Sequence, residues 1–206
     1  MAATGGAGQT RQRLLTAAAE EFIVSGYSGA SMSRIASRLG LTKGAFGHHF
    51  PTKESILVAI QEHTVAVLDR VAGAAEEAFP ESPVRACVAY FAGIAPLASQ
   101  DPVFHASVLL FQDPSAPIPV IRPTRERLRT HLLRMLRRDG SDAPLTVDPD
   151  RAAQYLLVLL SGLLAAARFA GSEGAKDDIA VMTIALRGLG VVDAETVIAD
   201  VLGGHS

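Results

Sequence analysis

Apolar side chains recur every three or four positions along most of the 206 residues, and no segment alternates apolar and polar residues as a strand does. The spacing predicts a first helix over about residues 9–25 and a long helix over about residues 53–78. Prolines follow at positions 80 and 83. Further helices are expected over about residues 83–95, 102–111, 149–170, 176–189 and 194–202, with one more that ends near residue 138. Residues 113–123, which contain four prolines, are expected to form a loop or a distorted entry to that helix. The pattern therefore predicts an all-α fold.

Two short helices that meet at a sharp turn are predicted between the first helix and the long one. Ser31 is a suitable N-cap for the first short helix, and Gly40 follows its end. Thr42 can cap the second, over about residues 43–49, and Pro51 ends it. Two helices separated by a short turn that contains glycine form the helix-turn-helix, whose second helix enters the major groove of DNA. A generic helical corner in an all-α core has the same pattern.

The charges are divided unevenly, although the net charge of the chain is −2. Residues 1–60, which we call the head, hold six basic and three acidic side chains and carry +3, so the remainder carries −5. A basic head on an acidic body fits a protein that contacts phosphates at one end.

The composition favours a cytoplasmic protein. Cys87 is the only cysteine, so no disulfide can form within the chain, as is typical of a reducing compartment. The first ten residues show no charged start or apolar run of a secretory signal. The longest apolar run, from Tyr155 to Ala167, is shorter than the roughly 20 residues that a membrane span needs.

The residues around the turn are more specific than the bare pattern. Residues 41–54, L-T-K-G-A-F-G-H-H-F-P-T-K-E, follow a helix that starts near residue 10 and resemble the tetracycline-repressor (TetR) family of transcriptional regulators. The close resemblance covers about residues 11–60, and the remainder is similar only in helix count, spacing and length. It implies a three-helix DNA-binding domain over residues 9–52 and a helical-bundle ligand-binding and dimerisation domain over residues 53–206. The implied function is a ligand-responsive regulator that binds double-stranded operator DNA as a homodimer.

The resemblance also implies roles for residues of the DNA-binding domain. Hydroxyl groups at the start of the first short helix would contact the DNA backbone, and the first residues of the second helix would face base edges. Lys43 is the candidate for a guanine contact, and Ala45 could touch a thymine methyl group. Phe46 and Phe50 match core positions. The expected DNA-binding residues are Ser31, Ser33, Thr42, Lys43, Gly44, Ala45, Gly47, His48, His49 and Lys53.

Gly47 departs from the family, which usually has a tyrosine that contacts DNA at this position. Its absence removes a contact, and glycine inside a helix costs about 1 kcal/mol relative to alanine. Two interpretations are open. Gly47 is either a lost contact, which His48 partly replaces, or a residue that lets the backbone approach the groove as part of the readout.

Two other patterns have ordinary explanations. His48 and His49 diverge by about 100° on a helix and have no nearby cysteine or carboxylate to complete a metal site, so we expect no metal and no cofactor. The seven arginines between Arg122 and Arg138 could form a second nucleic-acid surface, but a solvated helix face needs no partner and explains them as well.

The eighth expected helix, over about residues 149–170, is apolar nearly all round and must be buried on two sides. One side would face its own body and the other a partner subunit. The resemblance implies that the eighth and ninth helices form a four-helix homodimer interface. The small residues that would permit close packing there are Ser161, Gly162, Ala165, Ala166, Ala180 and Ala185.

A ligand pocket is expected among the fourth to eighth helices of the body. Its candidate residues are mostly aromatic and suggest a mainly apolar effector with one or two hydrogen bonds, and the alternative is that most of them are plain core. Residues 101–107, D-P-V-F-H-A-S, resemble the γ-butyrolactone-receptor branch of the family, which usually places a tryptophan in the pocket; this chain has none. The candidate ligand-binding residues are Tyr90, Phe91, Phe104, Val108, Phe111, His131 and Tyr155.

Two other functional classes fit the sequence less well. An all-α enzyme is not supported, because the chain has no nucleotide-binding glycine loop, no H-E-x-x-H, no G-x-S-x-G and no paired carboxylates at a plausible site. A helical lipid-binding or interaction protein, whose head no longer binds DNA, is the second alternative, and Gly47 slightly favours it. The residues do not distinguish a repressor from an activator, and the family resemblance favours a repressor.

Overall fold

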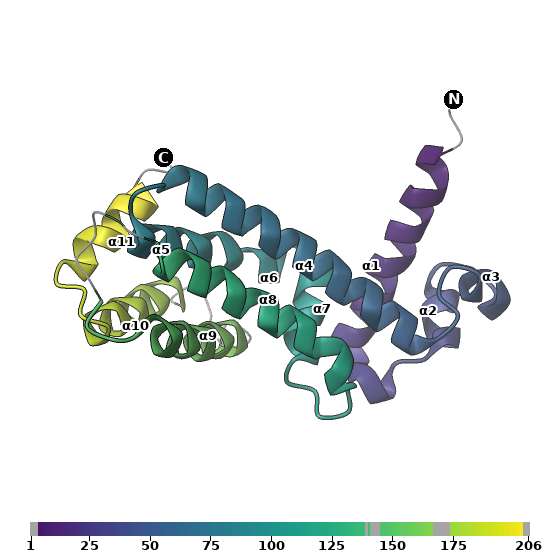
Figure 1. The fold of residues 1–206 in the computed structure, drawn as a ribbon. Helices are drawn as coiled ribbons and strands as arrows, with labels where there is room; N and C mark the ends of the chain where they lie inside the picture. The colour runs from purple at the N-terminus through teal and green to yellow at the C-terminus, as the bar shows by residue number, and fades with distance from the viewer. Residues whose placement is uncertain (1–3, 139, 141–144, 167–173, 204–206) are drawn as a thin grey trace. The chain divides into compact units, whose positions relative to one another are not determined.

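The computed structural model describes residues 4–138, 140, 145–166 and 174–203, and every regular element in this part of the chain is a helix (Figure 1). The helices are α1 (Thr4–Gly29), α2 (Met32–Arg38), α3 (Lys43–Gly47), α4 (Lys53–Ala78), α5 (Pro83–Ile94), α6 (Leu97–Gln100), α7 (Pro102–Leu110), α8 (Ile118–Leu136), α9 (Pro149–Ala166), α10 (Gly174–Gly188) and α11 (Ala194–Gly203). The chain forms two compact units. Unit 1 holds residues 1–66 and 97–124, and unit 2 holds residues 67–96 and 125–206.

The expected all-α fold is confirmed, with shifted ends for some helices. The long helix α4 has the expected bounds, whereas the short helix α6 was not expected. Helix α8 begins at Ile118, inside the proline-rich segment. Pro119 is tolerated in its first turn, where a backbone N–H has no helical partner, whereas Pro123 lies inside the helix and removes one hydrogen bond. The expected turn over residues 171–176 lies partly outside the described residues, as does the end of the helix expected over residues 149–170.

The core of unit 1 is organised around the apolar stripe of α1. Leu14, Leu15 and Phe22 are at most 3% exposed and belong to one cluster with Phe46 of α3 and Phe50, which follows α3. Helix α7 packs along α1 and adds further apolar side chains to the same cluster. This shared core holds α2 and α3 against α1, as the helix-turn-helix interpretation requires.

A kink at Gly26 ends the regular part of α1. Its φ of 66° is a left-handed conformation that glycine adopts readily. Asp113 accepts a hydrogen bond from the backbone N–H of Tyr27 at 2.6 Å, and Ser115 accepts one from the N–H of Ser28 at 3.1 Å. Hydrogen bonds from the Ser115 hydroxyl and then from Tyr27 hold the pKa of Asp113 below its usual value. We call this arrangement of two side chains and two backbone amides the Asp113 clamp.

Candidate nucleic-acid interface and ligand site

Both short helices of the motif begin at side-chain caps. The hydroxyl oxygens of Ser31 and Thr42 each accept a hydrogen bond from the backbone N–H three residues later, at 3.2 and 3.1 Å. Gly40, between the two helices, has a φ of 66° and ends α2 in the left-handed conformation. The predicted helix-turn-helix is therefore present, with an α3 that is shorter than expected.

The amino-terminal half of α3 is open to solvent. Lys43, Gly44 and Ala45 are exposed, whereas Phe46 is buried in the core of unit 1. Ser33, Thr42 and His48 are exposed as well, and Ser31, Gly47, His49 and Lys53 are half-buried. Most of the expected DNA-binding residues therefore lie at the surface of one small region, although their contacts with DNA remain predictions.

The two glycines of α3 have room for a side chain. A Cβ atom at Gly47 would meet nothing within 4 Å, and a Cβ atom at Gly44 would meet only the hydroxyl of Thr42, at 4.0 Å. Neither glycine has a positive φ. Because the fold does not require glycine at either position, both interpretations of Gly47 stay open.

The ammonium group of Lys53 is engaged within unit 1. Its Nζ donates a hydrogen bond to the carbonyl of Tyr27 at 2.6 Å and lies 3.4 Å from the carbonyl of Ala30. It also lies 4.4 Å from the centroid of the Tyr27 ring. A cation near the last carbonyls of a helix is favourable, so Lys53 stabilises the end of α1. The sequence did not reveal this contact.

Two arginines of the head are paired with a buried carboxylate. Glu21 is only 1% exposed, and its oxygens lie 3.1 Å from Nε of Arg34 and 3.3 Å from Nε of Arg38. These ion pairs join α1 to α2 and use part of the positive charge that the sequence places in the head. Within the described residues, the basic side chains of the head without a carboxylate partner are Arg11, Arg13, Lys43 and Lys53.

The expected ligand-binding residues are divided between the two units. Three belong to unit 1, namely Phe104, Val108 and Phe111. Four belong to unit 2, namely Tyr90, Phe91, His131 and Tyr155. Their role in binding a ligand is not tested by their positions, and it stays a prediction.

Tyr90 and His131 are partners of each other in a buried network of unit 2. The Tyr90 hydroxyl lies 2.8 Å from Nδ1 of His131, and Nε2 of His131 lies 2.9 Å from Asp69. Arg127 donates two hydrogen bonds to the same carboxylate, at 2.6 and 2.8 Å. Burial lowers the pKa of His131, against the opposing effect of Asp69, so the neutral ring donates from Nε2 and accepts from Tyr90.

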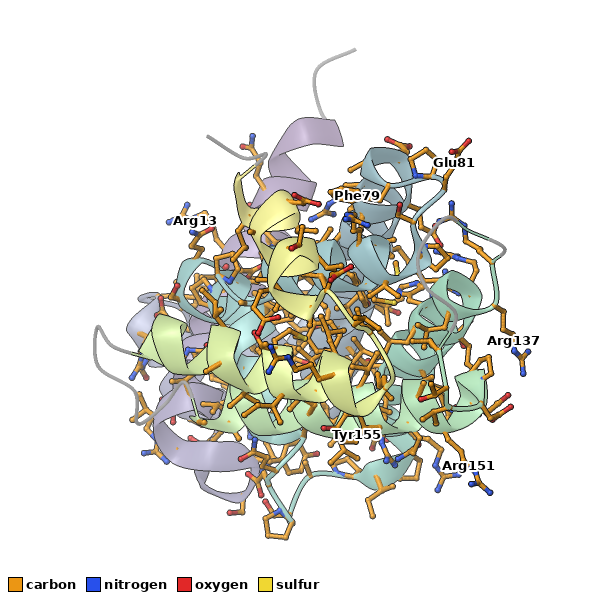
Figure 2. The ribbon with its side chains drawn as sticks, turned by 90° about the vertical axis from the view of Figure 1, so that its left-hand side faces the viewer. Arg13, Phe79, Glu81, Arg137, Arg151 and Tyr155 are labelled. Carbon is orange, nitrogen blue, oxygen red and sulfur yellow. The ribbon has the colours of Figure 1, made fainter. Side chains whose placement is uncertain are left out.

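An apolar cavity of about 340 Å³ lies in unit 2 between α5, α9, α10 and α11. Phe91, Leu160 and Met182 are among its lining residues, and Asp178 is the one ionisable group among the described residues of the lining. Its size and apolar lining are typical of a small-molecule site. Of the seven expected ligand-binding residues, only Phe91 lines it. Tyr155 is 45% exposed and lies at the surface of α9 (Figure 2).

The arginine-rich face of α8 is largely paired within unit 2. Arg127 and Arg134 each make two hydrogen bonds to a carboxylate of α4, and Arg129 and Arg137 both contact Asp150. These pairs agree with a solvated helix face. Among the described residues, no three histidine, cysteine or acidic side chains gather to hold a metal. No helix in the described ranges is long and apolar enough to cross a membrane.

Comparison with known sequences identifies the head. A profile of the bacterial regulatory proteins of the tetR family matches residues 14–60. The HTH-type transcriptional regulator SrpR of Pseudomonas putida is 43% identical over 52 residues, which cover 25% of this chain and 24% of SrpR. The chain therefore aligns with only about a quarter of that relative.

Similarity to solved structures extends over nearly the whole chain. A gamma-butyrolactone receptor (ArpA-like protein) is 27% identical with a TM-score of 0.73, over 95% of this chain and 97% of the receptor. CprB from S. coelicolor A3(2), a TetR family protein, is 26% identical with a TM-score of 0.69, over 94% of this chain and 97% of CprB. The likeness thus continues from the helix-turn-helix through the helical body: residues 14–60 match the tetR family of regulatory proteins, and the chain as a whole is similar to solved structures of TetR-type regulators.

Proposed function

We propose that this protein is a ligand-responsive repressor that binds operator DNA as a homodimer. The observation that carries the proposal is the exposed start of α3, where Lys43 has no carboxylate partner among the described residues and Gly44 and Ala45 add little bulk. In a helix-turn-helix, these amino-terminal residues contact base edges in the major groove. Residues 9–52 would form the DNA-binding domain, and residues 53–206 would bind the effector and the partner subunit.

The proposed dimer interface is the exposed apolar face of α9 and α10, which are the eighth and ninth helices expected from the sequence. Val158 of α9 and Ile184 of α10 are 59% and 69% exposed in the protomer, and Tyr155 lies on the same helix as Val158. Large apolar side chains at helical spacing on an open surface are typical of an interaction site. Ala166 is exposed and can contact a partner. The expectation for Ala185 is wrong, because it is fully buried within its own protomer.

The proposed effector is a mainly apolar small molecule, and the cavity of about 340 Å³ in unit 2 is its candidate site. The apolar lining favours an uncharged ligand, because a buried charge without a partner is costly. Phe91 is the one expected ligand-binding residue that lines this cavity. Tyr90 and His131 satisfy each other instead, so their hydrogen bonds are not free for the effector in this structure. In this proposal the protein binds operator DNA and its effector in the cytoplasm and catalyses no reaction.

Selection from a library of randomised DNA duplexes tests this function directly. A dimeric helix-turn-helix protein should enrich a palindrome with half-sites about one helical turn apart or at a multiple of that spacing. The enriched duplex should bind at least 10³-fold more tightly than random DNA, measured by fluorescence anisotropy. Equal affinity for enriched and random duplexes would exclude a sequence-specific regulator.

The effector proposal is tested on the same complex. A neutral γ-butyrolactone with an alkyl side chain is the first probe, because the gamma-butyrolactone receptors are similar in structure over most of the chain. It should lower operator affinity in proportion to its occupancy of the protein. Leu163→Trp, which would fill part of the cavity from α9, should remove the response and leave DNA binding intact. A response that persists in this variant would place the effector elsewhere.

A further inference from the structure

We propose that Arg11 of α1 binds a DNA phosphate, in the role that the family resemblance assigns to Lys53. The inference rests on the proposed function, since it concerns how the same head holds operator DNA. It follows from the contacts of the basic side chains in unit 1. Some of them bind other groups of the protein, and others have no carboxylate partner among the described residues.

The ammonium group of Lys53 already binds other groups of the protein. Its ammonium group donates to the carbonyl of Tyr27 at 2.6 Å and lies over the Tyr27 ring, and a second carbonyl lies at 3.4 Å. To contact a phosphate, Lys53 would have to leave these groups and uncover the last carbonyls of α1. The contacts by which Lys53 stabilises the folded protein therefore compete with any contact that Lys53 could make to DNA.

Arg11 is held beside the motif without being neutralised. Its guanidinium carbon lies 4.9 Å from the centroid of the Phe50 ring, and Phe50 follows His49, an expected backbone contact. Arg11 precedes Leu14 and Leu15 by three and four positions, so it lies on the same face of α1, one turn before the first buried residues. It is exposed, and no carboxylate in the described residues pairs with it.

This position suits a phosphate contact. Stacking on an aromatic ring restricts the side chain, so less conformational entropy is lost when it binds a partner. The planar guanidinium group then presents a fork of N–H donors whose geometry matches phosphate oxygens. Phosphate contacts of this kind fix the orientation of a protein on DNA but do not read the sequence.

Arg13 provides a matched control on the same helix. It carries the same charge, is exposed, and lies about 200° around the helix from Arg11. Its side chain projects away from the ribbon (Figure 2). A loss of DNA binding that depends only on net charge would be the same for both arginines, whereas a direct contact would be specific to Arg11.

The test measures how the operator affinity depends on salt for Arg11→Met, Arg13→Met and Lys53→Met. Methionine keeps much of the apolar cover over Phe50 and removes the charge. For Arg11→Met, the slope of log K against log salt should decrease in magnitude by about 0.9 per subunit, with a similar fold-loss for operator and random DNA and an unchanged melting temperature. Arg13→Met should keep the wild-type slope. Lys53→Met should lower the melting temperature and keep the slope, and Arg11→Lys should restore most of it.

Equal slopes for Arg11→Met and Arg13→Met would overturn the proposal. A decreased slope in Lys53→Met with an unchanged melting temperature would overturn it as well, because it would return the phosphate contact to Lys53. Failure of the proposed function appears differently, since the wild-type protein itself would then show no preference for any selected duplex.

Discussion

At the scale of single residues, Gly47 is a position at which a substitution can be tested for its effect on DNA binding without disturbing the fold. A side chain at this position would point into open space in the free protein, and its backbone φ suits any residue. An effect of substitution on DNA binding is therefore not a by-product of a strained head. The same holds for Gly44, where an added Cβ atom would have its nearest neighbour, the Thr42 hydroxyl, 4.0 Å away.

We predict that Gly47→Tyr raises the affinity for both operator and random DNA if the glycine is a lost contact. One recovered hydrogen bond contributes about 1 kcal/mol, which is several-fold in affinity. If the glycine is part of the readout, the ring would meet the groove and only operator affinity would fall. Gly47→Ala is the control, because it raises helix propensity at least as much as tyrosine would without adding a ring. Identical binding by all three proteins would show that residue 47 does not face DNA.

At the scale of elements, features that depend on neighbouring residues were predicted, whereas contacts between residues far apart in the sequence were not. The bounds of α4 and the caps of α2 and α3 follow from neighbouring residues, and both were predicted. The contact of Asp113 with Tyr27 joins residues 86 positions apart, which no local pattern encodes. Arg11 could have been noticed at the edge of the α1 stripe, but its aromatic neighbour could not.

The candidate ligand site shows the same limit. Aromatic residues and a histidine in the body suggested a pocket, and Phe91 does line a cavity. Whether Tyr90 faces a ligand or His131 depends on how α5 and α8 pack within unit 2. That packing is a product of the whole core and has no short sequence signature.

The network that joins α4, α5 and α8 in unit 2 makes stability depend on pH. Burial lowers the pKa of His131 from 6.5, so the folded protein takes up this proton less readily than the unfolded chain. The stabilisation is complete above pH 6.5 and is lost as the pH falls through 6.5 toward the lowered pKa of the folded state. Arg127 lowers the pKa of Asp69, whose own titration therefore lies at a more acidic pH.

We predict that the melting temperature falls between pH 7.5 and 5.5, and that His131→Gln reduces this dependence. At pH 7.5 the variant should be less stable by about 1–3 kcal/mol, because the hydrogen bonds of Tyr90 and Asp69 would be disturbed. His48→Gln, at an exposed histidine, should behave as the wild type. Thermal denaturation followed by circular dichroism provides the measurement, and an unaltered pH dependence in His131→Gln would contradict the assignment.

At the scale of the whole molecule, the exposed apolar faces of α9 and α10 link the protomer to its proposed assembly. A single head contacts one half-site, and a two-fold dimer contacts two, so the interface determines how tightly an operator is bound. The exposure of Val158 and Ile184 lets the interface be tested without damage to the core.

We predict that Val158→Glu converts a dimer into a folded monomer. The side chain is 59% exposed in the protomer and tolerates a charge there, but in the dimer an unpaired carboxylate would be buried at a cost of several kcal/mol. Val192→Glu is the control, because Val192 is 77% exposed and lies outside α9 and α10. Analytical ultracentrifugation at micromolar concentration distinguishes the states. A monomeric wild type, or a dimeric Val158→Glu, would remove this interface from the proposal.

The Asp113 clamp has a consequence for hydrogen exchange. Amides near the end of a helix usually open easily and exchange their protons quickly. The amide of Tyr27 instead donates to a carboxylate at 2.6 Å, so its protection factor should exceed that of the next uncapped amides along the chain. The pKa of Asp113 is lowered in the folded protein, so this protection should persist at mildly acidic pH and disappear as the pH falls through that lowered value. The last turn of α1 should therefore open in acid before the rest of the helix does.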